Sequence, residues 1–323
     1  MATHQIDWRD TLPAECRNGA IAIGNFDGAH CGHARLIEEL SQAAQTVAGP
    51  AVAVTFHPHP RALLRPQALT EVLTTLADRT ALLHQLGADH VVVLCSTIEL
   101  FRLRAADFFD QVIVRSLAAR AMVEGPNFCF GYEREGDIPR LRALCAAAEI
   151  DLRIVPPVLL EETEVSSSRI REALMQGDLV MANRLLGRPY QISGVVGPGE
   201  RRGRTLGFPT ANLQQIPTVV PAEGVYAVTL RLESGARHAG AANIGANPTF
   251  EESARKVEIH LIGFDGDLYG QKLDVNFHAR LRDTRRFNSV EELVSQLNRD
   301  VDQARQIGQE LLAGKTAMNA RTP

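Results

Sequence analysis

Residues 24–37 read GNFDGAHCGHARLI, and this stretch decides how the first half of the chain is interpreted. It follows a short apolar run, AIAI at residues 20–23, and leads into a segment whose apolar side chains recur at helical spacing. Those side chains fall on one face at about 3.6 residues per turn: Leu36, Ile37, Leu40, Ala44 and Val47. The pattern predicts a strand, a glycine-rich turn and a helix that begins near His33.

The same alternation of apolar runs and helical stretches continues through the first half of the chain. The runs lie at 20–23, 51–56, 90–94, 121–123 and 152–155. Repeated strands and helices predict a Rossmann-like α/β domain, in which a parallel sheet is covered on both faces. Ligands of such sheets bind beyond the carboxyl ends of the strands, so the turn at 24–30 is a candidate site.

The pattern changes near residues 187–192, where Gly, Pro, Asn and Thr become frequent. Segments such as 225–232 and 257–261 then alternate in the manner of half-buried antiparallel strands, which predicts a small β-barrel or sandwich. A long helix follows, with Ser289 and Glu292 as a capping box. Its apolar stripe, expected to pack on the barrel, comprises Val290, Leu293, Val294, Leu297, Val301, Ala304 and Ile307. The predicted domains are 1–187 and 188–315, with a frayed tail from about residue 314.

Composition narrows the class of protein. The 323 residues exceed what one hydrophobic core usually organises, and 45% hydrophobic with 22% charged residues is typical of a soluble globular chain. The net charge of −4 gives no reason to expect nucleic acid, although Arg201, Arg202 and Arg204 could meet a phosphate. Five scattered cysteines without a C-x-x-C pair favour a reducing compartment. Without a signal segment or a membrane-spanning run, we expect a cytoplasmic protein with no membrane partner.

The turn at 24–30 has the residue types that a phosphate site needs. Glycines let the backbone approach a ligand, and a helix start supplies unpaired N–H groups. His30 and His33 could converge and neutralise charge on an α-phosphate and its leaving pyrophosphate. A purely structural turn with surface histidines is an equal alternative. Zinc binding is a third, because several nearby side chains are possible ligands: His30, Cys31, His33, His57 and His59.

A second candidate site lies in the β-rich half, where residues 199–213 read GERRGRTLGFPTANL. Gly203 and Gly207 free the backbone to wrap phosphates, and Thr210 and Asn212 could project to one side and hold Mg²⁺. A hairpin turn would use the same residues. In the alternation of 257–261, Glu258 shares a face with His260, and that face could simply be solvent-exposed.

These motifs, taken in order, resemble one family. The G-x-F-D-G-x-H-x-G-H stretch resembles the FAD synthetase branch of the nucleotidyltransferase superfamily, as found in bifunctional riboflavin kinase/FAD synthetases. Further matches are TFHPHP at 55–60, GPNFCFG at 125–131 and VSSSRIRE at 165–172. The 199–213 segment matches the G-x-x-x-G-R-x-x-G-[FY]-P-T-A-N hallmark of riboflavin kinases. It is followed by PAEGVYAV, NIGANPTF, VEIHL, DLYG and LRDTRRF.

The resemblance implies two ATP-dependent reactions. The C-terminal module would make FMN and ADP from riboflavin, and the N-terminal module would make FAD and pyrophosphate from FMN. Catalytic roles are implied for His30, His33, Arg171 and Glu258, with Glu258 as the base for the ribityl hydroxyl. ATP or phosphate contacts are implied for Gly24, Phe26, Gly28, Ser167, Ser168, Gly199, Gly203, Arg204 and Gly207. Flavin contacts are implied for Phe56, Asn127, Phe128, Asp137 and Arg282, with Mg²⁺ at Thr210 and Asn212.

Two points stay open. Family members often have Asp where this chain has Gly263, which leaves the role of that carboxylate in doubt. A chain with one inactive module, or a flavin carrier without turnover, would also keep much of this pattern. Neither the oligomeric state nor the passage of FMN between sites follows from the sequence.

Overall fold

The structure is a computed structural model that describes residues 2–64, 71–199, 202–245 and 256–313. By its internal contacts the chain divides into two compact units between Ser166 and Ser167. The predicted tail beyond residue 314, Arg201 and residues 246–250 of NIGANPTF lie outside the described residues. Each unit is described by itself.

The first unit contains a six-stranded parallel sheet in the order β1-β4-β3-β2-β5-β6, which confirms the predicted parallel sheet. Its strands are β1 (Ala2–Ile6), β2 (Ala20–Ile23), β3 (Ala51–His57), β4 (His90–Cys95), β5 (Ala121–Glu124) and β6 (Asp151–Ile154). The five predicted runs are β2 to β6. The edge strand β1 was missed, because its sequence ATHQI contains no apolar run.

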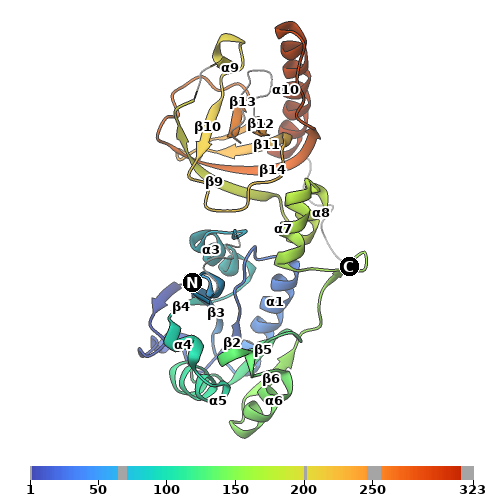
Figure 1. Cartoon of the computed structure of the whole chain (residues 1–323). Helices are drawn as coiled ribbons and strands as arrows, with labels where there is room; N and C mark the ends of the chain where they lie inside the picture. Colours follow the sequence, from blue (N-terminus) through green and yellow to red (C-terminus); the bar gives the residue numbers. More distant parts are fainter. Residues whose placement is uncertain (1, 65–70, 200–201, 246–255, 314–323) are drawn as a thin grey trace. The chain divides into compact units, whose positions relative to one another are not determined.

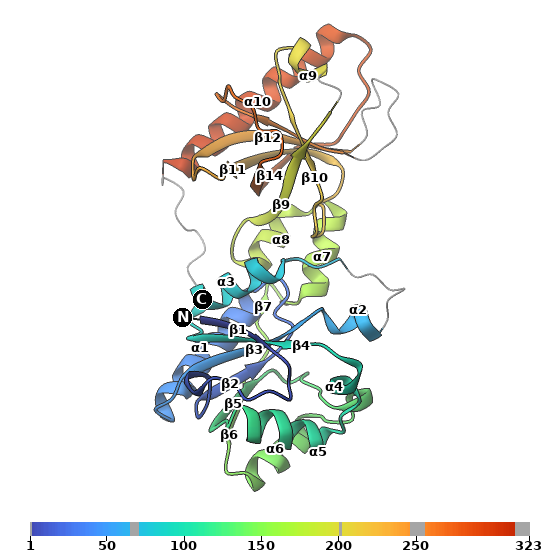
Figure 2. The same cartoon turned by 90° about the vertical axis from the view of Figure 1, so that its left-hand side faces the viewer.

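Helices cover both faces of this sheet, and each face has its own apolar core (Figure 1, Figure 2). One core joins the strands to α1 (Cys31–Thr46) and α3 (Leu76–Leu86). The other joins them to η1 (Ala14–Cys16), α4 (Ile98–Arg102), α5 (Ala105–Phe108), the π-helix η2 (Phe109–Ser116) and α6 (Ile138–Ala147). Shorter elements are α2 (Pro60–Leu64), η3 (Tyr132–Arg134) and the hairpin of β7 (Leu159–Leu160) and β8 (Thr163–Glu164). Leu36, Ile37, Leu40 and Ala44 of α1 are buried, as the helical spacing predicted, whereas Val47, the fifth predicted residue, follows the helix as its C-cap and is half-buried.

The second unit is a closed antiparallel barrel preceded by two helices, α7 (Ser167–Gln176) and α8 (Leu179–Leu186). The strand order is β10-β13-β12-β11-β14-β9, and β9 pairs with β10 to close the ring. The strands are β9 (Tyr190–Gly197), β10 (Ala211–Gln214), β11 (Gly224–Arg231), β12 (Arg237–Gly245), β13 (Lys256–Leu261) and β14 (Lys272–Arg282). A short helix, α9 (Arg202–Thr205), lies between β9 and β10. Of the two predicted alternatives, barrel and sandwich, the chain forms the barrel.

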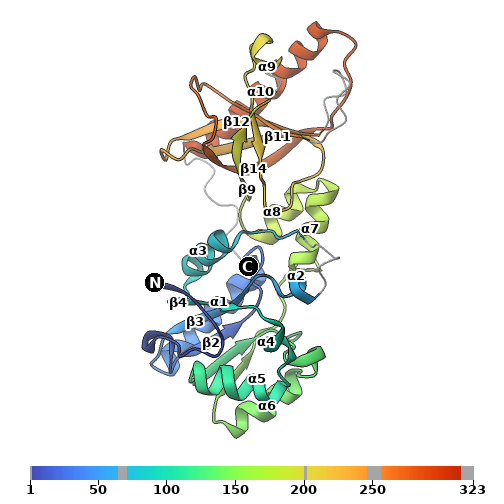
Figure 3. The same ribbon diagram turned by 60° about the vertical axis from the view of Figure 1, so that its left-hand side comes forward.

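The long C-terminal helix α10 (Val290–Leu312) packs on β11 and β12 (Figure 3). Ser289 caps it as predicted, since its Oγ accepts the Glu292 N–H at 3.2 Å. The Glu292 carboxylate accepts the N–H of Asn288 at 3.1 Å. In a capping box it would accept the N–H of the N-cap residue itself, which here is Ser289. Val290 of the predicted stripe, the first residue of the helix, is 50% exposed. The helices of the described ranges include none that is long and apolar enough to span a bilayer.

Candidate functional site

His30 ends the turn that follows the carboxyl end of β2, and His33 lies in the first turn of α1. The imidazole rings of His30 and His33 are stacked, with 3.6 Å between centroids and 14° between planes. His30 is the N-cap of α1, and its Nδ1 accepts the backbone N–H of His33 at 3.3 Å. With Nδ1 as acceptor, neutral His30 carries its ring proton on Nε2. The turn thus joins a helix N-terminus to an imidazole N–H donor, which suits a phosphate.

Close packing shapes this turn from the protein side. A Cβ on Gly32 would lie 3.2 Å from the His30 ring, so glycine gives the ring room over the helix start. The ring of Phe26 is 1% exposed and meets His33 edge to face, with 5.2 Å between centroids. A Cβ on Gly24 would lie 3.3 Å from the Phe26 ring. Phe26 therefore supports His33 from within the core.

Asp27 ties the turn to a distant segment of the chain. Its buried carboxylate accepts hydrogen bonds from the backbone N–H of Leu73 at 2.9 Å and of Thr74 at 3.1 Å. The Thr74 Oγ1 donates to Asp27 at 3.2 Å and accepts the N–H of Gly28 at 3.0 Å. Gly28 has a φ of +84°, which glycine adopts without strain. Sequence reasoning missed Thr74, since its partners lie 46 residues away.

A buried arginine lies beneath the same turn. Arg79 of α3 is 2% exposed, and its Nη1 donates to the carbonyl oxygen of Asn25 at 2.7 Å. Burial lowers the pKa of this guanidinium, and the carboxylate of Asp27 opposes that shift. No sequence pattern pointed to Arg79, because an arginine in a helix is usually solvent-exposed.

Glu124 ends β5 at the point where the strand order reverses between β2 and β5. Its carboxyl group is 2% exposed and accepts the N–H of Ile23 at 2.8 Å. Burial raises the pKa of Glu124 well above its ordinary value, although the Ile23 N–H opposes the shift. Glu124 therefore joins β5 to β2 at the switch point, where open α/β sheets bind their ligands.

The predicted flavin residues of the first unit lie at the end of β3 and in the segment after β5. Phe56, half-buried, packs near Phe101 with 6.2 Å between ring centroids. Phe128 stacks on Phe130 with 5.6 Å between ring centroids, and Phe130 is 6% exposed and belongs to the core. Asn127 is exposed.

Asp137, another predicted flavin residue, has a local structural partner. Its side chain caps α6 by accepting the N–H of Arg140 at 3.0 Å. The residue is exposed, and so is Asn127 on the same loop.

The zinc alternative at the histidine turn is not formed. Across residues 2–64, 71–199, 202–245 and 256–313, one group of three or more His, Cys, Asp or Glu side chains has its donor atoms within 4.8 Å of one another. That group is His4, Cys16 and His90, and none of the five predicted zinc ligands belongs to it.

The serine-rich motif begins α7, in the second unit. Ser167 is the first helical residue, Ser168 is exposed and Arg171 is half-buried on the next turn. Arg169 forms an ion pair with Glu172 at 2.6 Å. The predicted helix start is therefore present, with the two serines at its N-terminal end.

In the barrel, three polar residues form a row across neighbouring strands. Asn212 of β10 lies directly opposite Glu258 of β13, and Glu258 lies opposite Asn243 of β12. Residues directly opposite in an antiparallel pair share a face. All three are half-buried, so the face of Glu258 is not simply solvent-exposed. Sequence reasoning quoted Asn243 in a motif but gave it no role.

The glycine-arginine segment approaches this row. Gly199 lies so close to the Asn212 amide that a Cβ would fall 2.0 Å from Nδ2, and a Cβ on Gly203 would fall 2.3 Å from the Phe208 carbonyl oxygen. Gly207 has a φ of +85°. Arg204 lies in α9. The glycines therefore permit close backbone approaches that other residues would block.

Thr210, the residue before β10, is exposed and lines a pocket of about 550 Å³. The other walls come from Val196, Pro209, Ala211 and Leu261, and from residues 264–269. His260 supports this side, since its Nδ1 lies 2.8 Å from the carbonyl oxygen of Pro209. The pocket places a threonine of the predicted metal pair on a ligand-sized cavity.

Arg282, a predicted flavin contact, is engaged by the protein. Its guanidinium donates to both carboxylate oxygens of Asp300 on α10, at 2.7 to 3.0 Å. Asp300 is 2% exposed. This ion pair joins β14 to α10. The spacing of Arg282 and Asp300 in the sequence did not indicate it.

These two units define a two-module protein with one phosphate-type site on a Rossmann-like sheet and another on a closed barrel. Family models agree with this division: "FAD synthetase" matches residues 12–169 and "Riboflavin kinase" matches residues 186–308. The chain belongs to the bifunctional riboflavin kinase/FMN adenylyltransferase family.

Relatives of that name cover nearly the whole chain. The protein of Pseudomonas fluorescens is 38% identical over 91% of this chain and 94% of its own length. That of Escherichia coli K12 is 34% identical over 88% and 91%. A solved structure from Streptococcus pneumoniae, described as a macrolide-efflux protein, is 31% identical, with a TM-score of 0.84 over 94% of this chain and 98% of that one.

Proposed function

We propose that the chain uses ATP in two successive reactions, phosphorylating riboflavin to FMN in the barrel unit and adenylylating FMN to FAD in the Rossmann-like unit. The observation that carries this proposal is that each unit has its own glycine-bearing phosphate candidate at a chemically suitable place. Riboflavin, FMN and ATP are the substrates, and FAD, ADP and pyrophosphate the products. The macrolide efflux for which the similar Streptococcus pneumoniae protein is named is not adopted, since both family models name flavin enzymes.

In FMN adenylylation, a phosphate oxygen of FMN attacks the α-phosphorus of ATP and pyrophosphate leaves. His30 donates from Nε2 to the developing charge, and the stacked His33 adds a second imidazole. Gly24, Gly28 and the buried Phe26 shape the turn around the phosphates. This step needs no protein nucleophile, because positioning and charge stabilisation suffice.

Further phosphate and flavin contacts are assigned to this reaction from the family motifs. Ser167 and Ser168 bind phosphate through hydroxyl and helix N-terminal groups, and Arg171 adds charge as a catalytic residue. The flavin contacts are Phe56, Asn127, Phe128 and Asp137.

In riboflavin phosphorylation, Glu258 accepts the proton of the ribityl 5′-hydroxyl as its oxygen attacks the γ-phosphorus and ADP leaves. The row of Asn212, Glu258 and Asn243 supports this role, because it holds the carboxylate between two amide side chains on one face. The phosphate loop contains Gly199, Gly203, Arg204 and Gly207. Arg282, on β14 of the barrel, contacts the flavin.

Thr210 and Asn212 fit a magnesium ion. Their side chains offer a hydroxyl and an amide oxygen, which with phosphate oxygens make the hard donor set that Mg²⁺ prefers. When bound, the ion neutralises charge on the ATP phosphates. Thr210 and Asn212 would hold that ion, and Asn212 lies directly opposite Glu258 on the neighbouring strand.

The functional boundary proposed is between residues 187 and 188, which the start of the riboflavin kinase match at residue 186 supports. A cytoplasmic location is supported by the five cysteines, all of which are free thiols.

The test is to incubate the purified chain with riboflavin, ATP and Mg²⁺ and to separate the flavins by chromatography. We expect FMN to appear first and FAD to follow, with ADP and pyrophosphate in matching amounts. FMN without FAD would indicate an inactive first module. Unchanged riboflavin would contradict the proposal and favour a flavin carrier.

A further inference from the structure

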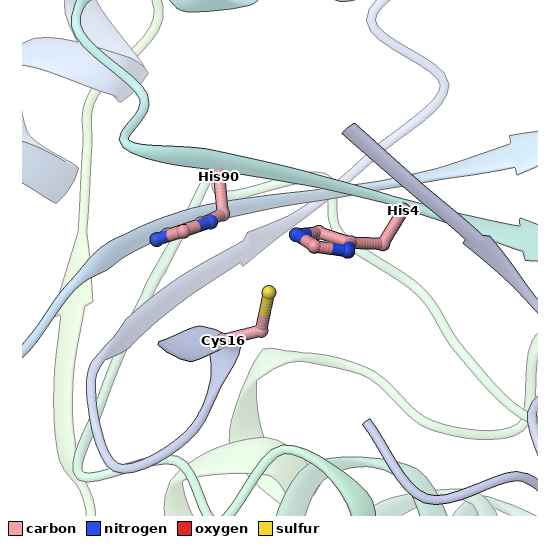
Figure 4. Close-up of side chains that lie close together, drawn as sticks. All are labelled: His4, Cys16 and His90. Carbon is pink, nitrogen blue, oxygen red and sulfur yellow. The ribbon is translucent and has the colours of Figure 1, made fainter. Parts of the chain in front are cut away.

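Three side chains from separate segments converge on one point of the first unit, apart from the histidine turn. They are His4 on β1, Cys16 at the end of η1 and His90 at the start of β4. Their donor atoms all lie within 4.8 Å of one another. In Figure 4 the Cys16 sulfur points toward the space between the two imidazole rings. The cluster therefore brings two nitrogen donors and one sulfur donor together.

Burying the donor atoms of this cluster without a ligand costs folding free energy. Cys16 has no exposed surface, and the Nε2 of His4 and the Nδ1 of His90 are buried with no hydrogen-bond partner. Buried polar atoms in native proteins are almost always paired, so two unpaired ring nitrogens beside one thiol call for an explanation.

We propose that His4, Cys16 and His90 bind a zinc ion. Two imidazoles and a thiolate are ligands that Zn²⁺ accepts in tetrahedral sites, and a water molecule supplies the fourth. Bond lengths of about 2.0 to 2.3 Å require donor separations of about 3.5 Å, so the three side chains close in by about 1 Å. Cys16 gives up its thiol proton to solvent as the zinc–sulfur bond forms.

The position of the cluster indicates a structural role. His90 is the first residue of β4, so the cluster lies toward the amino end of that strand, whereas the histidine turn follows the carboxyl end of β2. β1 is an edge strand that pairs with β4 alone. A bound zinc ion joins β1, η1 and β4 and thereby stabilises the attachment of that edge.

The experiment is to titrate the full-length, chelator-treated chain with Co²⁺ and then to displace it with Zn²⁺. We expect one metal per chain and a thiolate-to-cobalt charge-transfer band in the near ultraviolet. Cys16→Ser should remove the band, and His4→Asn or His90→Asn should weaken zinc binding at least about 100-fold, the upper end of what losing an outer-shell partner costs. Zinc should raise the melting temperature of the parent chain but not that of Cys16→Ser.

Matched controls come from the same unit. Cys145→Ala removes another buried thiol, which is 1% exposed, and should leave the cobalt band intact. His84→Gln removes a histidine whose ring nitrogens already lie within hydrogen-bonding distance of Thr3 and Ala88, and should leave zinc affinity unchanged.

Two results would overturn the proposal: a parent chain that binds no Co²⁺ or Zn²⁺ at micromolar concentration, or a charge-transfer band that survives Cys16→Ser. Because the parent chain is itself titrated, the test does not depend on the folding of the variants. Zinc-free protein resupplied with Mg²⁺ should keep both flavin reactions within about twofold, and loss of either would overturn the structural role.

Discussion

The two candidate sites are built in different ways. In the first unit His30 is 6% exposed, and the turn that carries it is held by buried polar groups from other segments, Thr74, which bonds to Asp27 of the turn, and Arg79. In the barrel, Asn212, Glu258 and Asn243 are half-buried and owe their alignment to strand register. The first site should therefore be sensitive to changes beneath it. The second should tolerate changes outside its row as long as the barrel stays closed.

The largest expected effect is a reciprocal loss of the two activities. His30→Asn keeps a side chain that can cap α1 but removes the imidazole, so FAD formation should fall about 100- to 1000-fold while FMN formation stays within about twofold. Glu258→Gln keeps the size of the side chain but removes the base, so FMN formation should fall about 100- to 10000-fold. Each rate is measured with its own flavin supplied. Loss of both activities in either folded variant would contradict two separate sites.

The next effect tests the support beneath the first site. Asp27→Asn replaces an acceptor of three hydrogen bonds with a side chain that also carries an NH₂ group facing those donors. FAD formation should fall about 10- to 100-fold through kcat, because a small displacement of the turn misplaces His30. FMN formation should not change.

The matched control is Asp89→Asn. Asp89 also accepts a backbone N–H, that of Ala51 at 2.9 Å, but it lies before β4, away from the histidine turn. This variant should lose stability without losing FAD formation. An equal loss of FAD formation in the two variants would mean that general destabilisation, rather than the turn, accounts for the Asp27 result.

The elements of both units could largely be predicted from the sequence. β2 to β6 are apolar runs of the length and spacing that a parallel sheet requires, and α1 carries its stripe on one face. β1 was not predicted, because an edge strand can alternate Thr, His and Gln with apolar residues. Barrel and sandwich could not be separated, because closure depends on pairing between β9 and β10, which alternation alone does not reveal.

Some residues of the candidate sites could be predicted from the sequence, and others could not. His30 and His33 could be found because three glycines and two histidines stand together in one turn. Thr74, Arg79 and Glu124 could not, because each is a single polar residue whose importance comes from a partner on another element. Asp300 was missed for the same reason, since its bond to Arg282 joins a strand to a helix.

A smaller effect, on stability, is expected from the ion pair that anchors the barrel. Asp300→Asn leaves the largely buried guanidinium of Arg282 without its carboxylate, which should lower the free energy of unfolding of the barrel unit by about 3 kcal/mol. The control Asp302→Asn removes an exposed pair with Arg305 and should cost less than about 1 kcal/mol. Thermal unfolding followed by circular dichroism measures both. FMN formation below the melting temperature should stay near the parent rate, and a raised KM for riboflavin would show that Arg282 must be held in place to contact flavin.

The smallest expected effect concerns Glu124, whose pKa in the folded chain is raised by burial. At pH values above about 4.5 the unfolded chain releases this proton and the folded chain keeps it, so folding loses up to about 1.4 kcal/mol per pH unit until the folded pKa is reached. Glu124→Gln still accepts the Ile23 N–H but has no proton to release. The unfolding free energy of the variant should therefore rise relative to the parent as pH increases from 5 to 8.

Urea unfolding measures this difference, followed by the fluorescence of Trp8, the single tryptophan, which packs against the core of the first unit. The exposed Glu149→Gln is the control and should give a curve parallel to the parent. Parallel curves for Glu124→Gln would contradict a neutral Glu124. A neutral acid at this position has a chemical advantage, because an ionised carboxylate at the end of β5 would repel the polyphosphate that the neighbouring turn is proposed to bind.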